Sequence, residues 1–119
     1  MIKWIFLLRF PEGVSEEEGS KWYLRVHTQE VKGARGLVQY RTWPLEPIPE
    51  GIPGSRKRRW VRLTEAVFHD WDAYRESMSI DYTPAPWAPE KPGFIAETIS
   101  VSVDPQFDLL HDGIPEQLP

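Results

Sequence analysis

The chain has 119 residues, of which 40% are hydrophobic and 27% charged, and its net charge is −4. This length suits one domain, and the hydrophobic fraction is large enough for a packed core, which excludes a disordered chain. The acidic balance gives no general attraction for nucleic acid. Because the chain has no Cys, disulfides, thiolate nucleophiles, iron–sulfur clusters and thiolate zinc sites are excluded.

The N-terminal segment, residues 2–9, is apolar on both alternations, which is typical of a central strand covered on both faces. This apolar run is too short for a secretory signal or a membrane span. We therefore expect a cytoplasmic protein with no membrane contact.

A helix is predicted next. Ser15 and Glu18 have the spacing of a capping box, and the helix should run to about Lys32, before Gly33. On a helical wheel its apolar side chains form one broad arc, and His27 lies inside that arc rather than on the polar side.

The later elements are predicted from alternation, caps and Pro-rich stretches. They are a strand over 35–43, a loop over 44–58, a strand over 60–68, a short helix capped by Asp70 with a Trp71, Tyr74 and Met78 stripe, a loop over 80–92 and a strand over 94–103. In the third strand, Glu65 shares a face with Leu63 and Val67, whereas Thr64 and Ala66 share the other face.

The order β-α-β-β-α-β predicts an α+β, ferredoxin-like fold with a four-stranded antiparallel sheet and two helices on one face. We expect this domain to span residues 1–103, and residues 104–119 to form a tail that packs on its own subunit or on a partner. If the tail packs, Phe107, Leu109 and Leu110 should be its anchors. Because the first strand has no polar side, the uncovered sheet face should meet the same face of a second copy, which predicts a homodimer.

Two short motifs resemble the EthD family of dimeric α/β-barrel proteins. The first comprises an aromatic pair, a His near the end of the first helix, then a Gly-Leu and a Tyr, here Trp22, Tyr23, His27, Gly36, Leu37 and Tyr40. The second is an acidic residue followed by Phe at the end of the third strand, here Glu65 and Phe68, with Asp70 and Trp71 after it. The resemblance covers residues 2–103 and implies a dimeric barrel and small aromatic, phenolic or lactone-like substrates.

The sequence departs from these relatives at two positions. Arg35 stands where the family usually has Pro before the Gly, and Ala66 stands where related muconolactone-type isomerases have Cys. Thiol-dependent isomerisation is therefore not expected.

His27 is the first candidate for catalysis, because an imidazole in an apolar arc can stay neutral and accept a proton. Tyr40 could donate a hydrogen bond to a developing enolate or phenolate. Glu65 could be the acid/base partner of His27, although a structural salt bridge with Arg41 or Arg62 is the stronger interpretation. Each could instead be an ordinary core residue.

Large rings are the candidates for substrate contact: Trp22 and Tyr23 on the first helix, and Trp87, which could cover the site from its loop. No metal site is expected, because the three His residues lie on different elements without the spacing of a metal cage. We also expect no cofactor.

The leading hypothesis is a cofactor-independent enzyme of isomerase, dehydratase or lyase type that acts on a small apolar molecule in catabolism or secondary metabolism. One alternative is a non-catalytic, ligand-binding accessory protein of an oxygenase or degradation system. Another is a haem- or oxygen-handling oxidoreductase with His27 as axial ligand. A ferredoxin-like fold does not choose among them.

Overall fold

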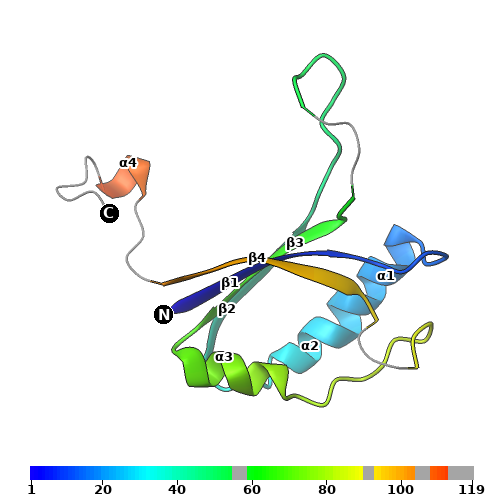
Figure 1. Ribbon diagram of the computed structural model, residues 1–119. Helices are drawn as coiled ribbons and strands as arrows, with labels where there is room; N and C mark the ends of the chain where they lie inside the picture. Colours follow the sequence, from blue (N-terminus) through cyan, green and yellow to red (C-terminus); the bar gives the residue numbers. More distant parts are fainter. Residues whose placement is uncertain (55–58, 90–92, 104–107, 113–119) are drawn as a thin grey trace.

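The structure is a computed structural model that describes residues 1–54, 59–89, 93–103 and 108–112 (Figure 1). Its elements are, in order, β1 (Ile2–Arg9), α1 (Glu16–Trp22), η1 (Tyr23–His27), α2 (Thr28–Val31), β2 (Leu37–Pro44), β3 (Arg62–Phe68), α3 (Trp71–Met78), β4 (Ile95–Val103) and α4 (Leu109–Asp112). Residues 55–58 of the predicted loop lie outside the described residues.

The four strands form one sheet in the order β2-β3-β1-β4, and every neighbouring pair is antiparallel. The helical segment 16–31 and α3 both lie on one side of this sheet (Figure 1). This arrangement confirms the predicted ferredoxin-like α+β fold, and it confirms the central position of β1.

Both predicted helix caps are present. The Ser15 hydroxyl accepts a hydrogen bond from the Glu18 backbone N–H at 3.0 Å, and the Asp70 carboxylate accepts one from the Ala73 N–H at 2.8 Å. Each cap satisfies a donor that the first helical turn leaves free.

Of the apolar stripe predicted on α3, Tyr74 packs against the core, but the other two residues do not form its buried side. Trp71 and Met78 are 45% and 47% exposed, whereas the small residues Ala73 and Ser77 are buried. Small side chains allow the helix to approach the sheet closely, which leaves the larger ones at its margins. At the same contact Gly36 has a φ of 77°, and a Cβ there would lie 2.6 Å from the Ala73 Cβ, which explains why this position is Gly.

Strand alternation divides the sheet into two faces, as predicted for β3. We call the face toward the helices the helix-side face; it carries Thr64, Ala66 and Phe68, which are at most 1% exposed. We call the opposite one the outer face; it carries Leu63 and Glu65, which are half-buried. The core therefore lies between the helix-side face and the helices.

The predicted C-terminal tail lies mostly outside the described residues, including its expected anchor Phe107. Leu110, another expected anchor, is 88% exposed in α4. In the part of the chain that the structure describes, every helix is too short or too polar to cross a membrane.

Candidate functional site

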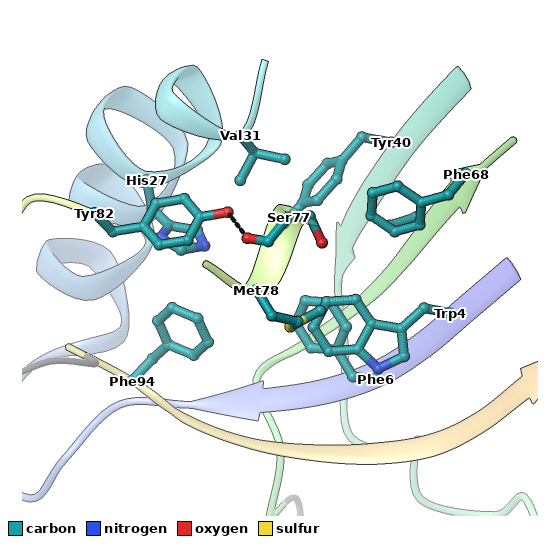
Figure 2. Close-up of a pocket in the computed structure, with 11 residues that line it drawn as sticks. Trp4, Phe6, His27, Val31, Tyr40, Phe68, Ser77, Met78, Tyr82 and Phe94 are labelled. Atoms are coloured by element: carbon teal, nitrogen blue, oxygen red, sulfur yellow. Dashed lines mark hydrogen bonds between the residues drawn. The ribbon is translucent and has the colours of Figure 1, made fainter. Parts of the chain in front are cut away.

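A cavity of about 350 Å³ lies where the 16–31 helix, α3 and the helix-side face of the sheet meet (Figure 2). This volume is in the range of sites for small organic ligands. Among the described residues, no Asp, Glu, Lys or Arg lines the cavity. The lining residues are Trp4, Phe6, His27, Val31, Tyr40, Ala66, Phe68, Ser77, Met78, Tyr82 and Phe94.

The helix widens where it meets the cavity. Residues Tyr23–His27 form a π-helical turn, η1, in which the Thr28 N–H donates to the Tyr23 carbonyl five residues earlier. Single π-helical turns of this kind occur frequently at functional sites. The turn brings the Tyr23 and His27 rings into a stack with centroids 5.3 Å apart.

His27 lies among aromatic rings. The centroids of Tyr82, Phe94 and Trp22 are 4.7, 4.9 and 5.8 Å from the centroid of its imidazole. Burial lowers the pKa of His27 from 6.5 to about 4, and the Glu30 carboxylate offsets part of this shift. The imidazole is therefore neutral at pH 7, with one nitrogen that donates a hydrogen bond and one that accepts.

Glu30 fixes the loop that brings Tyr82 to the cavity. Its carboxylate accepts hydrogen bonds from the Thr83 backbone N–H, at 2.9 Å, and from the Thr83 hydroxyl, at 3.2 Å. The Tyr82 hydroxyl donates to the Ser77 carbonyl at 3.0 Å, which ties the loop to α3 as well (Figure 2). These bonds hold the Tyr82 ring over His27.

Tyr40 ends a chain of hydroxyl groups that runs along the helix-side face. Its hydroxyl is hydrogen-bonded to that of Tyr23, and the Tyr23 hydroxyl lies 2.9 Å from Thr64 Oγ1. Thr64 Oγ1 donates to Thr42 Oγ1 at 3.0 Å, and Arg62 Nε donates to the same oxygen at 3.0 Å. Burial raises the pKa of both tyrosines, so both hydroxyls stay protonated.

The structure brings together three of the six residues singled out from the sequence. His27 and Tyr40 line the cavity, and Tyr23 contacts both of them. Trp22 and Trp87 instead pack against each other behind His27, with centroids 5.5 Å apart.

Glu65 lies on the outer face, away from the cavity. Its carboxylate pairs with Lys3 Nζ at 2.8 Å, so the interpretation as a structural salt bridge fits, but the partner predicted from the sequence, Arg41 or Arg62, is wrong. Lys3 and Glu65 are diagonal neighbours on paired strands, because Glu65 is opposite Ile5. Arg62 lies on the other face and donates to Thr42.

Several lining residues were not singled out from the sequence. Tyr82 and Phe94 come from the connection between α3 and β4, and Ser77 is the small residue on the buried side of α3. Trp4 and Phe6 read as ordinary strand residues. The one local feature that could have indicated Tyr82 was its position in a Pro-rich loop, which does not predict where its side chain lies.

Among the described residues, no group of three His, Asp or Glu side chains is placed to hold a metal ion. Of the polar groups that line the cavity, His27 is the imidazole, and Tyr40, Tyr82 and Ser77 supply hydroxyl groups around it.

The fold and the cavity together define a ferredoxin-like α+β protein with a small, mostly apolar cavity. The fold is similar to that of an EthD family protein from Bacillus halodurans, with a TM-score of 0.53 and 20% identity over 68% of this chain and 74% of that one. It is also similar to At3g17210 from Arabidopsis thaliana, with a TM-score of 0.54 and 13% identity over 90% and 100% of the two chains. At these identities the likeness establishes the fold. No model of a protein family and no curated protein matches the chain.

Proposed function

We propose that this protein is a cofactor-independent enzyme of isomerase, dehydratase or lyase type that acts on a small apolar aromatic, phenolic or lactone-like molecule. The observation that carries this proposal is a neutral imidazole, His27, in the wall of an apolar cavity. A buried neutral base beside a ligand can remove a proton from an acidic C–H or O–H group.

In such a reaction His27 takes a proton from one atom of the substrate and returns it to another atom or to a leaving group. The surrounding rings support the proposal, because they exclude water and hold a flat ligand against the imidazole. Tyr40 is a polar residue in the wall of the same cavity, and it supplies a fixed point for an oxygen of the substrate.

We further propose that the protein acts as a homodimer in the cytoplasm. The outer face of the sheet supports this proposal: Ile5, Leu7 and Leu63 are only half-buried there, and Trp43 is 40% exposed. A second copy that presents the same face would cover this apolar surface with matching area.

The proposal is tested by incubating the protein with a panel of phenols and lactones and following product formation by mass spectrometry. With a substrate in hand, His27→Ala should lower kcat about 100-fold or more, because a positioned general acid–base group contributes roughly that factor. His69→Ala is the matched control, because His69 is exposed and outside the cavity lining, and it should keep full turnover.

Undiminished turnover in the His27→Ala variant would contradict the catalytic role. Tight binding of a panel member without any product would favour the ligand-binding accessory protein instead, and His27→Ala would then change the affinity alone.

A further inference from the structure

The cavity has few polar groups, and the acceptor of each hydroxyl proton can be assigned. Ser77 Oγ donates to the Tyr74 carbonyl at 2.6 Å, and the Tyr82 hydroxyl donates to the Ser77 carbonyl at 3.0 Å. A hydroxyl has a single proton and a carbonyl has none to give. Both hydroxyls therefore present only lone pairs to a ligand.

The same reasoning settles the direction of the hydroxyl chain behind Tyr40. Thr64 gives its proton to Thr42, where the Arg62 N–H also donates. Thr64 must then accept from Tyr23, which in turn must accept from Tyr40. The Tyr40 proton is thus directed away from the cavity, and its oxygen is left to accept.

The next potential donor in the wall also has a partner within the protein. The Trp4 indole N–H donates to Thr98 Oγ1 at 2.9 Å, and no Lys or Arg is among the described lining residues. His27 has one N–H, but its second nitrogen is an acceptor because the ring is neutral. The wall therefore offers acceptors at Tyr40, Tyr82, Ser77 and His27 against a single possible donor.

We infer that the cavity selects neutral ligands that carry a hydrogen-bond donor, namely a phenol, enol or alcohol O–H, over carboxylates, ketones and ethers of the same size. This inference rests on the proposed function, because it names the substrate class of the same site. A ligand hydroxyl donates to the Tyr40 oxygen, whereas an anionic or carbonyl oxygen at that point meets lone pairs and loses its hydration without a new partner.

The inference also changes the role of Tyr40. The sequence suggests that Tyr40 donates a hydrogen bond to an oxyanion. In the hydrogen-bonded chain, however, the Tyr40 O–H already donates to Tyr23. In the arrangement of the structure Tyr40 is a positioning acceptor: it holds a protonated substrate oxygen. Turning Tyr40 into a donor requires the Tyr23 and Thr64 hydroxyls to rotate together.

The test compares 4-nitrophenol with 4-nitroanisole, which replaces the O–H by O–CH₃ on the same ring. Binding is followed by quenching of tryptophan fluorescence, below the pKa of the free phenol. We expect the phenol to bind up to about tenfold more tightly, the factor that one net hydrogen bond supplies. The preference should weaken in Tyr40→Phe, which leaves the acceptors at Tyr82, Ser77 and His27, and it should persist unchanged in the exposed control His69→Ala.

Tyr23→Phe combined with Thr64→Val gives the sharper result, because it removes both hydroxyls that can accept the Tyr40 proton. The Tyr40 O–H then turns to the cavity, and the preference should shift toward 4-nitroanisole and the nitrophenolate. The wild-type protein supplies a readout that needs no variant. At a pH where free 4-nitrophenol is half ionised, binding should convert it to the neutral phenol and remove its visible absorption.

Equal affinities for the two probes in the wild-type protein, or bound nitrophenol in the coloured phenolate form, would overturn the inference and leave the proposed function standing. Binding of neither probe would overturn the proposed class of small aromatic ligand, and the inference with it.

Discussion

The two faces of the sheet differ in chemistry although the same four strands build them. On the helix-side face, polar groups such as Thr64 are buried, and Thr64 is joined to Tyr23 of η1 in one hydrogen-bonded chain beside the cavity. On the outer face, apolar side chains such as Leu7 are half-exposed around one ion pair, Lys3–Glu65. Burial without water requires every polar group to have a hydrogen-bond partner. The second copy that we propose on the outer face would instead need a large area of contact more than many hydrogen bonds.

The largest expected effect comes from adjacent leucines of β1 that lie on opposite faces. Leu8 is fully buried, so Leu8→Ala should lower the free energy of unfolding by about 2–5 kcal/mol, through lost contacts and the cavity left behind. Leu7→Lys should leave the fold intact but dissociate the proposed dimer, because a charge would enter the outer face. Urea unfolding and native mass spectrometry measure the two effects.

A Leu7→Lys protein that remains dimeric would contradict the proposed interface. A Leu8→Ala protein with unchanged stability would contradict the position of the core itself. Leu7→Ala is the control for the loss of side-chain volume alone, because it introduces no charge.

The next effect is the pH dependence of the free energy of unfolding, which arises from His27 on the helix side of the sheet. Because the His27 pKa is lowered from 6.5 to about 4, the unfolded chain binds a proton in this window that the folded chain does not. The free energy of unfolding should therefore be unaffected by His27 above pH 6.5, fall as the pH drops toward 4, and level off below it. The full loss is at most about 3 kcal/mol, and the partial exposure of the ring reduces it.

This prediction is checked by urea unfolding across that pH range, with His27→Gln as a variant that has no titrating group. The difference between the two proteins isolates His27 from the carboxylates that titrate in the same range. An NMR titration of the ring gives its pKa directly, and a value near 6.5 would contradict the burial of the imidazole.

Local features of this fold could be predicted from the sequence because their causes are local. Ser15 and Asp70 cap helices through bonds that span three residues. The alternation of Thr64 and Glu65 assigns opposite faces without any knowledge of the partner strands. His27 could be placed in an apolar arc from the helical period alone.

The rest depends on which elements meet in space. The Tyr23–Tyr40 bond joins a helix to a strand, and the Lys3–Glu65 pair depends on the register of β1 against β3. Nothing in the local pattern around Tyr82 indicates that its ring lies over His27. Whether the cavity wall offers donors or acceptors can be assigned only when the acceptor of each hydroxyl proton along the hydrogen-bonded chain is known.

The smallest expected effect comes from the ion pair of the outer face. Glu65→Gln removes one charge from a pair that is partly exposed in the single subunit, where such pairs contribute about 0.2–1 kcal/mol, so the stability of the subunit should change by no more than that. Turnover should be unchanged, because Glu65 points away from the cavity that holds His27. A tenfold loss of kcat with an unchanged oligomeric state would show that Glu65 takes part in the reaction. A loss of kcat together with dissociation would instead mean that the two faces are coupled through the dimer.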